Sequence, residues 1–189
     1  MKTTCIQKQT EHRQRIINAM KEQAISKGFH KASMSEIAKS AELSVGQIYR
    51  YFAHKDDIIC ALVEQTTSCR LEFMSEFLNK QNWLSRHVAT PNQNTHDMRI
   101  LMIEIKAEAA RNTVISNICY ESHLILQNRA VEIMQKRYPT MGKEEIVARI
   151  DLLITITEGF MTSWNNQRNP PSAATINLYS EILENILPD

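Results

Sequence analysis

The chain has 189 residues, of which 43% are hydrophobic, so it can bury a core and is neither a disordered tail nor a disulfide-stapled miniprotein. Four glycines and five prolines are too few for a sheet with tight turns, and the abundance of helix-forming residues predicts an all-α fold. The net charge of +1 combines +6 over residues 1–55, from ten basic and four acidic side chains, with −5 over the remainder. This asymmetry is typical of a polyanion-binding segment joined to a body with another role, although small basic surfaces are common.

The first helix is predicted at about residues 10–27. Its apolar stripe recurs at three- and four-residue steps and consists of Ile16, Ile17, Met20, Ala24 and Ile25. Gly28 follows at the position expected of a C-terminal cap. Ser33 and Glu36 have the spacing of a capping box, which predicts the start of a second, short helix. Ser44 then predicts the cap of a third short helix, whose inner face is Val45, Ile48 and Phe52.

Five further helices are expected at about residues 56–80, 98–111, 113–137, 143–167 and 173–187. The whole chain is predicted to contain about nine helices. Asp56 and Asp57 favour the N-terminal turn of the first of these. The stretch from Trp83 to Asp97 is polar and contains Pro91, so it is predicted to be the least structured part of the chain. No apolar run has the length of a membrane span, and residues 1–10 lack the apolar region of a signal peptide. We therefore expect a cytoplasmic protein.

The second and third helices are joined by a three-residue turn, Glu42-Leu43-Ser44. Three short helices connected in this way are typical of a helix-turn-helix, in which the second helix contacts the DNA backbone and the third lies in the major groove. The faces that pack these two helices together are expected to use Ile37, Ala38, Ile48 and Phe52.

A longer pattern surrounds this turn. It consists of Gly28-Phe29, Met34 to Ala38, the run from Ala41 to Phe52, and then Lys55 with Asp57 and Ile58. Over residues 10–63 this pattern resembles the signature of the TetR family of bacterial transcription regulators. The resemblance implies a helix-turn-helix DNA-binding domain at 1–55 and an all-helical ligand-binding and dimerisation domain at 56–189. Glu42 departs from the family pattern, which usually has glycine at this position in the turn.

The resemblance also implies roles for individual residues of the first domain. Tyr49, Tyr51 and Lys55 match phosphate-contacting positions, where a phenol donates a hydrogen bond and an ammonium group releases counterions. Ser33 and Ser35 are expected to donate hydrogen bonds to the phosphates of the DNA backbone. The alternatives are that Ser33 serves only as a helix cap and that Tyr49 is a core residue.

The third helix carries the predicted base-reading residues. Ser44 begins this helix and projects toward the same side. Gln47 is the best candidate for direct readout, because its amide can pair with adenine through two hydrogen bonds. Val45 is expected to contact a thymine methyl group, and Gly46 to let the helix backbone approach the DNA closely.

The last two helices are predicted to form a two-fold dimer, as DNA readers of this geometry require. The predicted interface consists of Ile150, Leu153, Ile154, Met161, Ile176, Tyr179, Ile182, Leu183 and Ile186. The alternative is that these apolar faces close a single monomeric core.

A ligand pocket is expected among the helices of the body. Its predicted lining is Met98, Met102, Ile105, Cys119, Tyr120, Leu124, Phe160 and Trp164, although each of these could be an ordinary core residue. Such a lining favours an apolar or amphipathic small molecule. Glu104, Glu108 and Glu158 could balance a cationic ligand, or could be solvated or paired.

The function predicted is that of a dimeric repressor, released from a palindromic DNA operator when a small molecule shifts the body between two arrangements. The alternative is a DNA-binding protein controlled by a partner or by no ligand. No catalytic motif occurs, so enzyme activity is not expected, nor is any cofactor. The cysteines, Cys5, Cys60, Cys69 and Cys119, lack metal-ligand spacing, and redox sensing would require an exposed thiolate of low pKa.

Overall fold

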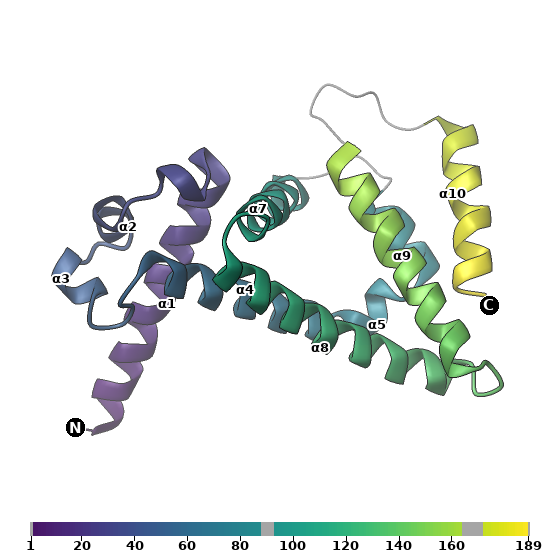
Figure 1. The fold of residues 1–189 in the computed structure, drawn as a ribbon, viewed down its shortest axis with the longest axis horizontal. Helices are drawn as coiled ribbons and strands as arrows, with labels where there is room; N and C mark the ends of the chain where they lie inside the picture. The colour runs from purple at the N-terminus through teal and green to yellow at the C-terminus, as the bar shows by residue number, and fades with distance from the viewer. Residues whose placement is uncertain (1, 88–92, 164–171, 189) are drawn as a thin grey trace. The chain divides into compact units, whose positions relative to one another are not determined.

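The structure is a computed structural model that describes residues 2–87, 93–163 and 172–188. These residues form ten α-helices and one 3-10 helix, and no strand occurs among them (Figure 1). The first elements are α1 (Lys2–Lys27), η1 (Phe29–Lys31), α2 (Met34–Ser40), α3 (Val45–Ile48) and α4 (Lys55–Glu72). They are followed by α5 (Met74–Phe77), α6 (Lys80–His87), α7 (Gln93–Ala109), α8 (Thr113–Arg137), α9 (Lys143–Ser163) and α10 (Ala173–Ile186). The all-α prediction is confirmed, and within these residues no helix is both long and apolar enough to cross a membrane.

The chain divides into two compact units. Unit 1 contains Met1–Thr66 and Ile100–Ser122, and unit 2 contains Thr67–Arg99 and His123–Asp189. Helices α4, α7 and α8 therefore contribute residues to both units. This division by packing differs from the predicted division at residue 55, which concerns function and stays a prediction.

Unit 1 is organised around the apolar face of α1. Helix α1 packs against η1 and α2, and α2 packs against α3. The stripe predicted from the sequence is almost completely buried, with Ile16, Ile17, Met20 and Ala24 at 1% exposure or less. The buried partners on the following elements are Phe29, Ile37, Ala38, Ile48 and Phe52. This packing holds α2 and α3 in the spatial arrangement that a helix-turn-helix requires.

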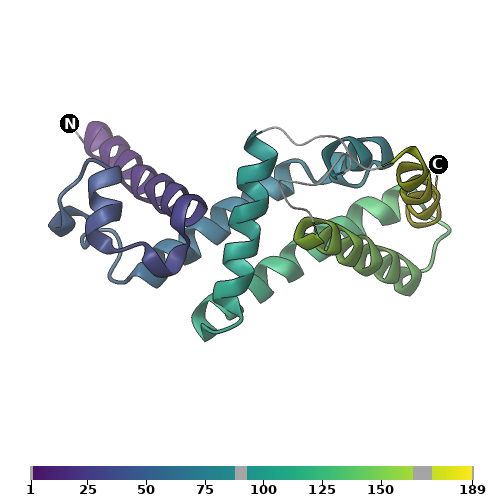
Figure 2. The same cartoon turned by 90° about the horizontal axis from the view of Figure 1, so that it is seen from above.

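Unit 2 is organised around Trp83 of α6, which is only 1% exposed. The Trp83 ring lies 6.2 Å from the Phe160 ring of α9 and 6.1 Å from the Tyr179 ring of α10, measured between centroids. The indole N–H of Trp83 donates a hydrogen bond of 2.9 Å to Thr157 Oγ1. Helix α10 accordingly packs against both α6 and α9 (Figure 2).

Several predicted helix boundaries were wrong. Helix α1 begins at Lys2 and not at about residue 10. The helix expected to reach residue 80 ends at Glu72, and residues 80–87 form the separate helix α6. The start of α6 is fixed locally, because the side-chain oxygen of Asn79 accepts a hydrogen bond of 3.0 Å from the backbone N–H of Asn82 and so caps this helix. The stretch expected to be irregular also contains the first turns of α7, which begins at Gln93.

Candidate nucleic-acid interface

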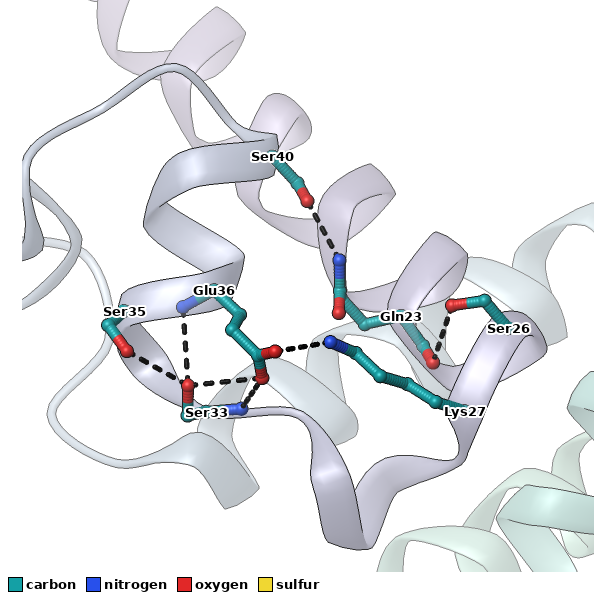
Figure 3. Close-up of polar contacts among 7 residues, drawn as sticks. All are labelled: Gln23, Ser26, Lys27, Ser33, Ser35, Glu36 and Ser40. Atoms are coloured by element: carbon teal, nitrogen blue, oxygen red, sulfur yellow. Dashed lines mark hydrogen bonds and ion pairs between the residues drawn. The ribbon is translucent and has the colours of Figure 1, made fainter.

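The start of α2 is fixed by the predicted capping box (Figure 3). Ser33 Oγ accepts a hydrogen bond from the backbone N–H of Glu36, and Glu36 Oε2 accepts one of 3.1 Å from the backbone N–H of Ser33. Ser33 Oγ also lies 2.9 Å from Ser35 Oγ. Both serines are exposed. Ser33 is therefore a helix cap in the free protein, and its predicted contact with a phosphate would add to this role.

Polar contacts attach α2 to α1 at this cap and near the other end of α2 (Figure 3). Lys27, in the last turn of α1, forms an ion pair with Glu36. Near the end of α2, Gln23 Nε2 donates a hydrogen bond of 2.8 Å to Ser40 Oγ. The hydrogen bond from Lys27 and that from the Ser33 backbone lower the pKa of Glu36. The carboxylate form that closes the capping box is thus favoured.

The turn between α2 and α3 accommodates Glu42 at a position where the family pattern has glycine. Glu42 has a φ of 51°, in the left-handed region where glycine is usual and other residues are strained. Arg15 of α1 compensates in part, because its Nη2 lies 3.0 Å from Glu42 Oε2 and 3.3 Å from the Glu42 backbone oxygen. The backbone thus keeps the conformation of the glycine turn although its residue has changed.

Replacing Glu42 tests this interpretation. We expect Glu42→Gly to be more stable than Glu42→Ala by about 1 kcal/mol in urea unfolding, since both remove the ion pair but only glycine relieves the left-handed strain. The exposed ion pair itself contributes at most about 1 kcal/mol, so Glu42→Gly should remain close to the wild type. Equal stability of the two variants would show that the turn relaxes to another conformation.

Helix α3 begins with a second capping box, which the sequence analysis did not identify. Ser44 Oγ accepts from the Gln47 backbone N–H at 3.2 Å, and Gln47 Oε1 accepts from the Ser44 backbone N–H at 2.8 Å. The side chain predicted to read adenine therefore also holds the start of its own helix. Its NH₂ group is the part best placed to donate to a base, and a two-bond pairing with adenine requires the Oε1 contact to be shared or given up.

The exposed face of α3 is formed by residues of the predicted set. Val45 was expected on the inner face of the helix but is 39% exposed, so that part of the prediction was wrong. Tyr49 is 55% exposed, so it is not a core residue. A Cβ atom added at Gly46 would meet no atom within 4 Å, which leaves this part of the backbone accessible to a binding partner. Ile48 on the opposite face is fully buried. The short helix is thus anchored on one side and open on the other.

Two predicted phosphate contacts have intramolecular partners. Tyr51 Oη lies 3.2 Å from His12 Nδ1 of α1, and the two rings meet edge to face. Lys55 Nζ donates a hydrogen bond of 3.1 Å to the Phe29 backbone oxygen. The role of His12 was not predicted from the sequence, because nothing local to residue 12 indicates a partner 39 positions away. Lys55 keeps further ammonium donors for a phosphate.

The residues predicted for the dimer interface fall into three groups. Four lie in the chain's own core at 7% exposure or less, namely Ile150, Leu153, Leu183 and Ile186. Ile154, Met161 and Tyr179 are half-buried. Ile176 and Ile182 are exposed, as are Leu152 and Leu178, which the prediction left out. The exposed apolar side chains of α9 and α10 are those available to a partner.

The residues predicted to line a ligand pocket are divided between the two units, and the pocket stays a prediction. Ile105 and Phe160 are buried, while Met98, Met102 and Cys119 are half-buried. Tyr120 and Leu124 of α8 are 64% and 37% exposed. Trp164 lies outside the described residues.

The half-buried cysteines have the properties of packing residues. Burial raises the pKa of the Cys60 thiol, with a smaller contribution from Asp56, and burial also raises the pKa of Cys119. A thiol with a raised pKa provides less of the thiolate that redox sensing needs. In the described parts of the chain, no three His, Cys, Asp or Glu side chains are grouped as a metal site would require.

A three-helix head with an open third helix and a basic composition defines the chain as a helix-turn-helix DNA-binding protein. Residues 16–62 match the family described as bacterial regulatory proteins, tetR family. The chain is also 30% identical, over 146 residues, to the HTH-type transcriptional regulator UidR of Escherichia coli K12, an alignment that covers 76% of this chain and 73% of UidR. The chain belongs to the TetR family and is a DNA-binding transcriptional regulator.

Solved structures share its fold. Salmonella enterica GusR has a TM-score of 0.73 at 22% identity, and the alignment covers 93% of this chain and 95% of GusR. The Bacillus subtilis regulator FadR, solved in complex with stearoyl-CoA, has a TM-score of 0.67 at 20% identity, with 93% of this chain and 97% of FadR covered.

Proposed function

We propose that the protein is a homodimeric repressor that leaves a palindromic operator when a small molecule binds its body. In this proposal residues 1–55 bind DNA, and residues 56–189 dimerise and bind the effector. A regulator of this kind acts where the chromosome lies, so the proposal places it in the cytoplasm. The observation that carries the release step is the way in which Phe29 of the head is held.

Both polar groups of the Phe29 backbone contact helices outside the helix-turn-helix. Its N–H donates a hydrogen bond of 3.3 Å to Glu104 Oε2 of α7, and its carbonyl oxygen accepts from Lys55 at the start of α4. Gly28, with a φ of 82°, allows this approach, because a Cβ atom there would lie 3.0 Å from Glu104 Oε2. Since α4 and α7 both continue into unit 2, a shift of either helix would act on the segment that leads into α2.

The dimer is supported by apolar side chains that the chain itself leaves uncovered. Leu178 and Ile182 lie one turn apart on α10 and are 60% and 42% exposed. Leu152 on α9 is 49% exposed and belongs to the same unit. Exposed large aliphatic side chains on two helices that pack against each other are typical of a subunit interface.

The chemistry of the effector is proposed from the predicted apolar lining and from one relative. FadR was solved with stearoyl-CoA, an amphipathic molecule. The lining predicted here is mainly methionine, aliphatic and aromatic, which suits a molecule with a large apolar part. We therefore propose an apolar or amphipathic effector.

The DNA-binding part is tested by fluorescence anisotropy on the DNA upstream of the chain's own gene, beside a scrambled duplex. Gly46→Ala is expected to weaken binding to the native duplex by about tenfold, since a methyl group at a close contact typically costs at least 1.4 kcal/mol. The head should fold normally, because alanine favours helix and the added Cβ meets no atom of the protein. An unchanged affinity would place the DNA away from α3.

The release step is tested on the same complex with added stearoyl-CoA and with other amphipathic molecules. The proposal expects at least one to lower the anisotropy of the native duplex and to raise the melting temperature of the free protein. A wild type that binds its operator, yet responds to none of them in either assay, would favour control by a partner.

A further inference from the structure

A hollow of about 210 Å³ lies in the head between α1 and the segment that begins with α3. Helix α1 contributes Lys8, Gln9 and His12 to its lining, and the segment from α3 onward contributes Gln47, Arg50 and Tyr51. All six side chains are polar, and none of the six carries a carboxylate. DNA contacts were predicted from the sequence for Gln47 and Tyr51, but no role was predicted for the three residues of α1.

Helical spacing explains why these residues meet. Lys8 and His12 are four positions apart on α1 and so lie on the same face of the helix, one turn from each other. Gln47 precedes Arg50 and Tyr51 by three and four residues. The hydrogen-bond contact between His12 Nδ1 and Tyr51 Oη, at 3.2 Å, joins the two walls. The two walls of the hollow are thus held together by a side-chain contact between α1 and the segment after α3.

The lining has the chemistry of an anion site. Lys8 and Arg50 provide two positive charges, and both are exposed. Every side chain in the lining can donate a hydrogen bond, which suits the acceptor oxygens of a phosphate.

We propose that this hollow receives a backbone phosphate of the operator, so that α1 binds DNA together with α3. Lys8 and Arg50 are the cations of the site, and His12 is a positioning residue that holds the Tyr51 hydroxyl at its wall. This inference rests on the proposed operator binding and adds a contact outside the helix-turn-helix. Because a phosphate carries no sequence information, the contact strengthens binding to every duplex equally.

The test compares wild type, Lys8→Ala and a control, Lys21→Ala, by fluorescence anisotropy over a salt series. Lys21 lies on the same helix, 13 residues further along, outside the hollow. We expect Lys8→Ala to weaken binding to the native duplex and to the scrambled duplex by the same factor, about three- to tenfold at low salt. The plot of log affinity against log salt has a negative slope, and its magnitude should decrease by about 0.9, the value for one lost phosphate contact. Lys21→Ala should change neither quantity.

His12 is tested by a double-mutant cycle with Tyr51. We expect His12→Ala to weaken binding in the wild-type background and to have no further effect in Tyr51→Phe, which lacks the hydroxyl that His12 positions. Equal losses from His12→Ala in both backgrounds would overturn the positioning role. Circular dichroism and melting temperature serve as folding controls for every variant.

The outcomes separate this inference from the proposed function. Wild type that shows no preference for the native duplex would refute the proposed operator. Wild type that binds, with Lys8→Ala unchanged in affinity and in salt slope, would refute the phosphate site alone. Competition by inorganic phosphate at constant ionic strength, seen with wild type and lost in Lys8→Ala, would support the site, because a free anion displaces the duplex from this hollow only if a phosphate of the duplex binds there.

Discussion

An Ile182→Asp variant is expected to be a folded monomer that binds the native duplex at least about 100-fold more weakly than wild type. Ile182 is 42% exposed, so aspartate is solvated in the monomer, but a dimer interface would have to bury its charge. Loss of the dimer leaves one recognition helix instead of two linked ones, and linkage of two binding modules typically raises affinity by about 10²–10⁴. Light scattering measures the mass, and anisotropy measures the affinity.

Asn177→Asp is the matched control. Asn177 is also exposed on α10, and at 100° per residue it lies about 140° around the helix from Ile182. The same acidic side chain there should leave both mass and affinity unchanged. If Ile182→Asp remained a dimer, the interface would use a different surface, and if it became a monomer with full affinity, the head would not need two copies.

The head was largely predictable because its signals are local. The stripe of α1, the Ser33–Glu36 box and the cap at Ser44 each depend on residues at most four positions apart, and all are present. The glycine expected in the turn is replaced by Glu42, yet the backbone keeps its left-handed φ. Family pattern and local chemistry thus agreed on the conformation, even where the residue differed.

The contacts between elements that are distant in the sequence could not be predicted in the same way. The Tyr51–His12 contact, the Lys55–Phe29 hydrogen bond and the Glu104–Phe29 hydrogen bond join residues 39, 26 and 75 positions apart. Each depends on how the helices pack, which a periodic pattern does not specify. Glu104 was therefore considered for a cationic ligand, whereas its carboxylate contacts a backbone N–H of the head.

The body shows a second limit of pattern reasoning. Helix α10 has apolar side chains on several faces, and periodicity alone does not separate the face that meets its own core from the face left for a partner. Leu183 is fully buried, while its neighbour Ile182 is exposed. Only the packing of α10 against α6 and α9 distinguishes them. Helix α6 itself was missed because Asn79 stood in the helix predicted to reach residue 80, and Trp83 opened the stretch predicted to be least structured.

Trp83 of α6 gives the largest expected effect on stability. Trp83→Ala is expected to lower the free energy of unfolding by about 3–5 kcal/mol, the range for removing a buried aromatic ring. The ring is 1% exposed and contacts Phe160 and Tyr179, and these two rings also contact each other, with centroids 5.6 Å apart. Alanine would therefore leave a cavity bordered by rings from α9 and α10. Urea unfolding followed by circular dichroism measures the change.

Trp83→Phe separates the ring from its hydrogen bond. Phenylalanine keeps most of the aromatic contact but leaves Thr157 Oγ1 without the indole N–H, which should cost about 1 kcal/mol for the bond in addition to the lost volume. In a Thr157→Val background the hydrogen-bond part of that cost should disappear, because the acceptor is already absent. A Trp83→Ala loss below about 1 kcal/mol would mean that α6 is not part of the folded core. Because α6 supports α10, a loss of stability in the expected range would also weaken the proposed dimer. The operator affinity of Trp83→Ala should then depend on protein concentration at temperatures where that of the wild type does not.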